Sequence, residues 1–174
     1  MAEFKPAFTQ MIRNEGGYKL HTVEGDRGGM TYAGIARNFH PTWEGWVLID
    51  GGFTKTSRIQ ELVQNFYKSL FWNQVQGDAI VNQDVATTIF DFAVNTGVKT
   101  AAKLAQALVK VKPDGVIGPK SVKALNKVDP DMFVIGYAVA KIHRYARICN
   151  RNKSQSKFLL GWINRTLKSL NFLR

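Results

Sequence analysis

The sequence predicts a mainly α-helical fold with a small β-hairpin element near the N-terminus. Two observations lead to this prediction. Apolar residues recur at helical spacing over most of the 174 residues, and residues 18–35 instead show short β-prone runs separated by Gly and Asp. The length suits one domain, or one domain with a small appended lobe, and no internal repeat or flexible linker interrupts it.

The first helix is expected over residues 3–14. Its apolar residues share one face: Phe4, Phe8, Met11 and Ile12. Gly16 and Gly17 end this helix, so Glu15 becomes its last residue and falls on the apolar face. A hairpin or wide turn then covers residues 18–35. The next twenty residues are mostly irregular, with a short helix near Trp43 to Val47.

Apolar stripes predict further helices over residues 57–70, 85–93, 101–109 and 155–170. Residues 111–118 form a turn rich in Pro and Gly, which we interpret as structural because it lacks the ligand spacing of a calcium loop. Pro119 opens a short helix that runs through Leu125. Asp129 is expected to cap a long helix that begins at Pro130.

Charge is distributed unevenly along the chain. Residues 1–98 carry 8 Lys/Arg and 10 Asp/Glu, whereas residues 99–174 carry 16 Lys/Arg and 3 Asp. From Lys141 to the end there are nine basic residues and no acidic one. This asymmetry favours binding to a polyanion, and nucleic acid, an anionic membrane and an anionic cell wall all qualify.

Several classes of protein and site are disfavoured. The single Cys149 cannot form an internal disulfide, and we interpret it as a small residue on a helix. The sequence does not open with a basic segment and a long apolar run, so we expect no signal peptide. The apolar run at residues 133–140 is too short to span a bilayer. His21, His40 and His143 form no zinc pattern, and we expect no cofactor.

Glu15 is the strongest candidate for a catalytic acid. Burial on an apolar face and the negative end of the helix dipole both disfavour an ionised carboxylate. A carboxylic acid that keeps its proton can protonate a leaving oxygen, and the two glycines that follow leave room for a large substrate. A structural interpretation, in which Glu15 pairs with a neighbouring Arg or Lys, stays open.

Glycoside hydrolysis needs a second group that positions water or stabilises the cationic sugar. Asp26 and Thr31 are candidates, because a hairpin that folds back over the helix end would bring them across from Glu15. Each also has a structural interpretation, Asp26 as a turn former and Thr31 as a strand residue. Tyr18 and Tyr32 flank the proposed acid and are candidate substrate-binding residues.

Two residues further along the chain could also contact a sugar. Asn95 could hydrogen-bond an N-acetyl group or a hydroxyl, or it could cap its helix beside Gly97. Trp72 could stack on a sugar face, although a Trp that follows an apolar stripe more often belongs to the core.

Two motifs resemble the signature of glycoside hydrolase family 108, namely Glu15-Gly16-Gly17-Tyr18 and Asp26-x-Gly28-Gly29-x-Thr31-x-x-Gly34-Ile35. The resemblance continues at residues 66–72 and 91–97, and then around residues 114–119 in a module described as a predicted peptidoglycan-binding domain. It implies a lysozyme-like fold and N-acetylmuramidase activity of the phage endolysin type, with Glu15 as the catalytic residue. The order Glu, Asp, Thr is also similar to the catalytic triad of phage-type lysozymes, which implies catalytic roles for Asp26 and Thr31.

The resemblance implies a catalytic lobe over residues 1–95 and a basic, peptidoglycan-binding helical lobe over residues 96–174, packed as one unit. The expected reaction is cleavage of the β-1,4 bond between N-acetylmuramic acid and N-acetylglucosamine by a monomer. The expected partner is bacterial peptidoglycan rather than nucleic acid, with an anionic membrane as a second partner of the basic C-terminal helices. We expect a bacteriolytic, antimicrobial protein that is made in the host cytoplasm and acts at the wall after release.

Two alternatives stay open. A lytic transglycosylase cleaves the same bond with one glutamate but closes an anhydro ring, and the presence of Asp26 favours hydrolysis over it. The second alternative is a wall- or membrane-binding protein without catalysis, which would use the basic helices at residues 133–149 and 155–174. The aromatic residues there are spaced for burial of a helix face rather than for stacking on bases.

Overall fold

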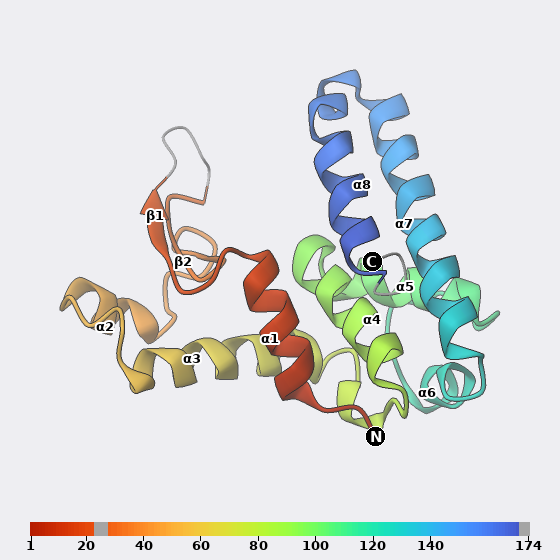
Figure 1. Cartoon of the computed structure of the whole chain (residues 1–174), viewed down its shortest axis with the longest axis horizontal. Coiled ribbons are helices and arrows are strands. Elements are labelled where there is room, and N and C mark those ends of the chain that lie inside the picture. Colours follow the sequence, from red (N-terminus) through yellow and green to blue (C-terminus); the bar gives the residue numbers. More distant parts are fainter. Residues whose placement is uncertain (23–27, 171–174) are drawn as a thin grey trace. The chain divides into compact units, whose positions relative to one another are not determined.

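The computed structural model describes residues 1–22 and 28–170. Its backbone contacts divide the chain into two compact units, Phe4–Leu70 and Met1–Glu3 together with Phe71–Arg174 (Figure 1). The first holds one small antiparallel sheet among helices, and the second consists of helices and loops over the part that the structure describes. The predicted fold class, mainly α with a small β element near the N-terminus, is confirmed.

The unit Phe4–Leu70 is built from three helices and three short strands within its described part. These are α1 (Phe4–Asn14), β1 (Leu20–Thr22), β2 (Met30–Tyr32), β3 (Ile35–Ala36), α2 (Gly45–Asp50) and α3 (Ser57–Tyr67). The strands pair antiparallel in the order β1-β2-β3, so the element predicted as one hairpin has a third strand. Helices α1 and α3 bury their apolar faces, and the rings of Phe8 and Tyr67 lie 6.0 Å apart.

A π-helical turn over Lys68–Trp72 follows α3 and corrects one sequence expectation. The predicted stripe continued to Leu70, but this side chain is 44% exposed, whereas Trp72 is fully buried. A π turn widens the helix and shifts the face that each later residue presents. Trp72 therefore serves the core, and its indole N–H donates to Asp78 Oδ1 at 2.7 Å. It is not placed to stack on a sugar.

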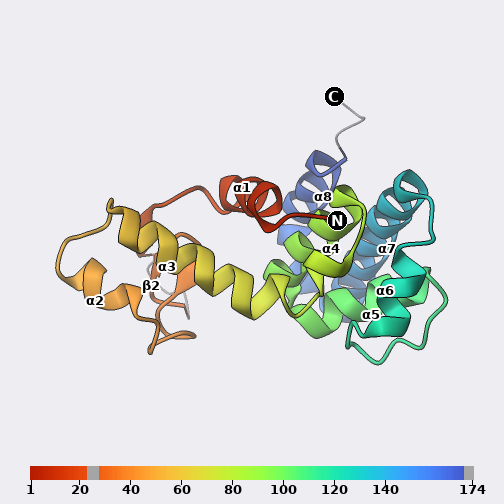
Figure 2. The ribbon, with the colours of Figure 1, turned by 90° about the horizontal axis from the view of Figure 1, so that it is seen from below.

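The helical unit contains α4 (Gln83–Thr96), α5 (Val98–Leu108), α6 (Pro119–Leu125), α7 (Pro130–Arg151) and α8 (Leu159–Lys168). Helix α4 packs on α5, and both contact α7 (Figure 2). Helices α7 and α8 run side by side in opposite directions (Figure 1). The predicted cap of α7 is confirmed, because Asp129 Oδ1 accepts a hydrogen bond from the Met132 N–H at 2.9 Å. Among the described helices, none is long and apolar enough to cross a bilayer.

The turn before α6 is held by a buried amide, as expected for a structural loop. Gln106 is 1% exposed, and its Nε2 donates to Asp114 Oδ1 at 2.8 Å and to Ser121 Oγ at 3.0 Å. Its Oε1 accepts from the Gly115 N–H at 2.9 Å. Hydrogen bonds from the Val116 N–H and from Gln106 lower the pKa of Asp114. The loop is therefore fixed from inside by one polar side chain.

The helical unit also buries charged groups. Lys141 is 2% exposed, and its ammonium donates to Thr88 Oγ1 at 3.2 Å and lies 5.3 Å from the centre of the Phe92 ring. Asp91 is 5% exposed and pairs with Arg165 at 3.5 Å. The sequence analysis counted Lys141 among the basic residues of the C-terminal stretch, but its side chain is buried up to the charged end. This burial lowers the pKa of Lys141 to about 8.

Candidate active site

Glu15 lies at the C-terminal end of α1, in a backbone conformation that two glycines fix. The Gly17 N–H donates to Ile12 O at 2.8 Å, and the Gly16 N–H donates to Arg13 O at 3.1 Å. These two bonds form a Schellman motif in which Glu15 is the C-cap residue, one position beyond the last residue of the helix. Gly16 and Gly17 have φ values of 87° and 81°, a region that strongly favours glycine.

The space beside both glycines is open. A β-carbon built on Gly16 or Gly17 would meet nothing within 4 Å. Their requirement for glycine is therefore conformational, and a ligand can approach the backbone here closely. This geometry agrees with the expectation that the paired glycines leave room beside Glu15.

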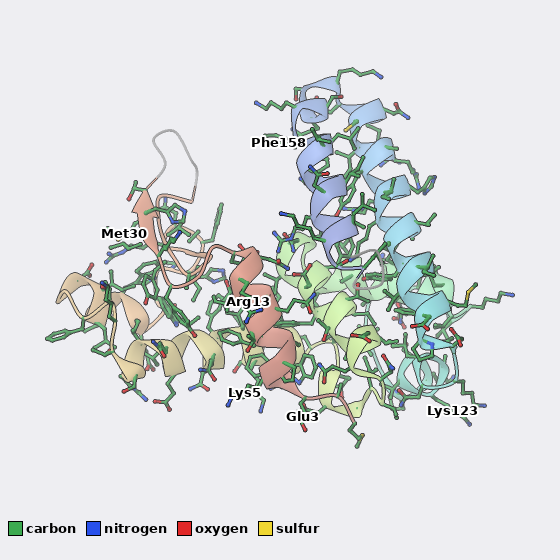
Figure 3. The ribbon with its side chains drawn as sticks, viewed as in Figure 1. Glu3, Lys5, Arg13, Met30, Lys123 and Phe158 are labelled. Atoms are coloured by element: carbon green, nitrogen blue, oxygen red, sulfur yellow. The ribbon has the colours of Figure 1, made fainter. Side chains whose placement is uncertain are left out.

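The side chain of Glu15 lies against the turn between β2 and β3. Figure 3 labels Arg13 in the last turn of α1, which Glu15 follows, and Met30 at the start of β2, which the turn follows. A β-carbon built on Gly34 would lie 3.1 Å from Glu15 Oε2 and 2.5 Å from the Tyr67 hydroxyl oxygen. The carboxyl and the phenol thus meet at the one position in the turn that lacks a side chain.

The turn itself is a two-residue hairpin connection. Ala33 and Gly34 have φ values of 50° and 82°, and Tyr32 pairs with Ile35 on either side of them. Positive φ at both central residues is the geometry of a type I′ turn. A positive φ is unfavourable for Ala33. The residue is held in this conformation by burial, with only 1% of its surface exposed, and by a hydrogen bond that the Tyr67 hydroxyl donates to its carbonyl at 2.8 Å. Tyr67 therefore positions the turn against which Glu15 rests.

Of the other two predicted catalytic residues, the structure describes Thr31 but not Asp26. Thr31 lies in the central strand β2, half-buried, with its hydroxyl 3.3 Å from Gly29 O as a hydrogen-bond donor. Strand alternation turns its side chain to the opposite face from that of Tyr32. Asp26 lies outside the described residues, so its catalytic role stays a prediction from the sequence.

The two candidate tyrosines are placed differently. Tyr18 is half-buried and hydrogen-bonds the Gln64 side chain, while burial raises the pKa of its phenol. Tyr32 is fully buried, and its hydroxyl donates to Thr54 O at 2.6 Å. The rings of Tyr18 and Tyr32 lie 6.5 Å apart. Tyr18 is exposed enough to contact a ligand. Tyr32 is not, and its burial favours a role in packing against Tyr18.

Sequence reasoning missed an aromatic cluster in the same unit. Trp43 is half-buried, stacks on Tyr32 at 6.4 Å and meets the Phe66 ring edge-on at 6.1 Å. His40 also meets the Phe66 ring edge-on, at 4.8 Å, and burial lowers the pKa of the His40 imidazole. His40 lies in a segment without periodicity, and Trp43 was expected only at the start of a short helix, which begins at Gly45 in the structure. No sequence pattern marks either residue as a sugar contact. A partly exposed indole supported by other rings can stack on a sugar face.

Asn95 belongs to the helical unit and lies in the last turn of α4. Its side chain is exposed, and Nδ2 donates to Asp91 O at 2.6 Å, within its own helix. The C-cap of α4 is Gly97, with a φ of 84°, so Asn95 does not cap the helix. Its predicted contact with substrate stays a prediction.

The arrangement around Glu15 can deliver a proton to a substrate that lies across open glycine backbone. The carboxyl is half-buried and held by a defined helix end and a defined turn, which keeps its position fixed during a reaction. Within residues 1–22 and 28–170, no cluster of three or more His, Cys, Asp or Glu side chains is arranged to hold a metal ion.

Comparisons with known proteins give two family matches. A family model described as glycosyl hydrolase 108 matches residues 8–97, and one described as a predicted peptidoglycan domain matches residues 99–167. No curated protein matches the chain significantly. The solved structure titled "Structure of Brucella abortus SagA" is 25% identical, with a TM-score of 0.66, and the match covers 97% of this chain and 95% of that one.

The two family models meet between residues 97 and 99, whereas the compact units of the structure divide at Leu70. Sequence-matched modules and compact units therefore differ in this chain. The assignment of a catalytic lobe to residues 1–95 and a wall-binding lobe to residues 96–174 stays a prediction.

Proposed function

This chain belongs to the glycosyl hydrolase 108 family, and from this premise we propose that Glu15 is the acid with which it cleaves the glycan strands of peptidoglycan. The observation that carries the proposal is the placement of the Glu15 carboxyl. It rests against Gly34 and the Tyr67 hydroxyl, at a helix end whose glycine backbone is open to a ligand. The motif that begins at Glu15 supplies the carboxyl, and the motif that begins at Asp26 supplies Gly34, against which the carboxyl rests.

The proposed bond is the β-1,4 linkage between N-acetylmuramic acid and N-acetylglucosamine. Glu15 donates its proton to the glycosidic oxygen as the bond breaks, which avoids a free alkoxide leaving group. Asp26 then directs a water molecule or stabilises the cationic sugar, and Thr31 helps to hold it. Tyr18 and Trp43 supply aromatic faces for sugar rings. Their partial exposure and ring contacts support this assignment.

Substitution of Glu15 by Gln tests the proposal, because it keeps the shape of the side chain and removes the acid. We expect the release of soluble fragments from purified peptidoglycan to fall by a factor of about 10² to 10⁴, with binding to the wall retained. Glu44→Gln is the matched control, since Glu44 is an exposed carboxylate in the same unit, outside the site. Activity of Glu15→Gln close to that of the wild type would refute the role of Glu15.

Mass spectrometry of the soluble products tests the bond and the type of reaction. Hydrolysis at the proposed bond leaves a reducing N-acetylmuramic acid end and adds one water for each bond that is cleaved. Products with an anhydromuramic end would instead identify a lytic transglycosylase. Products with reducing N-acetylglucosamine ends would identify the other β-1,4 bond of the strand as the target.

A further inference from the structure

A cationic groove lies between α5 and α7 in the helical unit. Its volume is about 200 Å³, and Leu104 of α5 and Ala140 and Ile148 of α7 supply its apolar surface. Four basic side chains of α7 line the same space: His143, Arg144, Arg147 and Arg151. The proposed chemistry at Glu15 uses none of these residues.

The sequence concentrates these charges on one face of one helix. Residues at intervals of three and four lie side by side along a helix, and Arg144, Arg147 and Arg151 follow these intervals. Like charges at this spacing repel each other and destabilise the helix. No Asp or Glu occurs after Asp131 in the sequence to offset the repulsion locally. A costly charge cluster beside a groove indicates a binding role rather than a structural one.

One of the arginines has an unmet hydrogen-bonding need. Arg144 Nε is buried and has no hydrogen-bond partner among the residues that the structure describes. Buried N–H groups of proteins nearly always find an acceptor. The protein therefore does not satisfy all donors of this guanidinium, which lines the groove beside two further arginines, Arg147 and Arg151. The groove is therefore suited to an anion rather than to a neutral sugar.

We propose that this groove binds the carboxylates of the peptides that are attached to the glycan strands of peptidoglycan. The proposal rests on the proposed function, in which peptidoglycan is the substrate. The planar guanidinium of Arg pairs with a carboxylate through two parallel hydrogen bonds. Peptide stems place carboxylates next to small aliphatic groups, and the groove places Arg147 and Arg151 next to Ala140 and Ile148. The match to the predicted peptidoglycan domain, residues 99–167, covers both walls of the groove.

The placement of the apolar residues favours a peptide over a membrane surface. A helix that lies in a bilayer interface presents its large apolar side chains outward between the basic ones. Here Leu104, Ala140 and Ile148 are only partly exposed and line the groove itself. The large exposed apolar side chains of α7 precede the arginines along the helix instead of lying between them: Met132, Ile135 and Val139. A small group can reach them there, whereas a bilayer surface requires an outward-facing apolar strip.

Binding of the full chain to insoluble peptidoglycan sacculi tests the proposal. The Glu15→Gln background keeps the wall undigested, and circular dichroism checks that each variant is folded. Arg147→Gln/Arg151→Gln removes two exposed charges of the groove. Lys123→Gln/Lys127→Gln is the matched control, since it removes the same net charge from exposed positions outside the groove, with Lys123 on α6 (Figure 3). We expect the groove variant to lose about tenfold or more in affinity and the control to stay within about twofold.

The source of the ligand is tested with walls whose peptides have been removed by an amidase. The amidase leaves one lactyl carboxylate on each N-acetylmuramic acid, so these bare strands lack the peptide carboxylates but keep an anion on the glycan. We expect the groove variant and its parent to bind them equally. Equal binding to intact sacculi, or an equal loss on bare strands, would overturn the proposal. So would a variant that loses binding only to phosphatidylglycerol vesicles, because that result would identify a membrane site. Full rescue by Arg147→Lys/Arg151→Lys would contradict the paired geometry, since Lys keeps the charge and lacks the planar fork.

The test separates this proposal from the proposed function. Sacculus binding in the Glu15→Gln background does not depend on turnover. In the chain with Glu15 intact, hydrolysis of short soluble glycan without peptides should be the same in the groove variant and the wild type. If Glu15 is not the acid, the binding results still stand, and the reverse also holds.

Discussion

The two compact units of this chain hold their side chains and loops in position by different means. In Phe4–Leu70, backbone conformation places the candidate site, through glycines at positive φ in the helix end at Gly16 and in the turn at Gly34. In the helical unit, buried polar side chains fix the structure through hydrogen bonds. Gln106 holds its loop, and Lys141 joins two helices. The first unit should therefore respond most to changes in backbone freedom, and the second to changes in charge.

The charges follow the same division. Phe4–Leu70 carries basic and acidic residues in similar numbers, whereas the C-terminal helices from Lys141 onward carry only basic ones. A site that transfers a proton needs one carboxyl in a controlled environment, and a surface that holds an anionic polymer needs many cations. The difference between the units thus matches the division of labour that we propose.

Gly34→Ala should have the largest effect, because it changes the backbone at the centre of the site. A methyl group there would collide with the Tyr67 hydroxyl and press on the Glu15 carboxyl, in a backbone region that L-residues rarely adopt. We expect a loss of about 3 kcal/mol in the free energy of unfolding and about 100-fold in wall hydrolysis. Urea unfolding and fragment release measure the two effects.

Gly52→Ala is the control that isolates the collision from the strain. Gly52 has a φ of +83°, close to that of Gly34, but its β-carbon would meet nothing within 4 Å. We expect a loss of about 1 kcal/mol and full hydrolytic activity. If the two variants behave alike, contact with Glu15 and Tyr67 has no special role.

Lys141→Met should change how stability depends on pH. Burial lowers the pKa of Lys141 to about 8, from an ordinary value of 10.5. Between these values the unfolded chain binds more protons than the folded chain, so the free energy of unfolding rises with pH. From pH 7 to 9 we expect a rise of about 1 kcal/mol in the wild type, which Lys141→Met removes by raising the value at pH 7.

Urea unfolding at several pH values measures this effect. The range stays at or below pH 9 because burial raises the pKa values of four tyrosines, whose ionisation near pH 10 in the unfolded chain would oppose the trend: Tyr18, Tyr32, Tyr137 and Tyr145. Lys123→Met is the control, since Lys123 is exposed, and it should keep the slope of the wild type. A wild-type profile that is flat from pH 7 to 9 would contradict the burial of a charged Lys141.

Gly161→Ala should have the smallest effect and the opposite sign to Gly52→Ala. Gly161 lies inside α8, at an ordinary helical φ, and a β-carbon there would meet nothing within 4 Å. Alanine lowers the entropy of the unfolded chain and favours the helix, so we expect a gain of about 0.5–1 kcal/mol. Destabilisation by Gly161→Ala, measured by urea unfolding, would mean that α8 has less room than its geometry indicates.

Local features of the fold could be predicted from the sequence. Pro119 and Leu125 bound α6 as expected, and Asp129 caps α7 as expected. The end of α1 was predicted to within one residue from the two glycines. Each of these features depends on interactions within about two helical turns, which the order of residues fixes by itself.

The tertiary structure decided which distant residues meet. Glu15, Gly34 and Tyr67 lie on three different elements, and only packing brings the carboxyl, the bare turn and the phenol to one point. The π turn that exposes Leu70 and buries Trp72 likewise depends on what surrounds it. Periodicity tells which face of a helix is apolar, but it does not tell which partner covers that face. The energy of such contacts belongs to pairs of residues that the sequence keeps far apart.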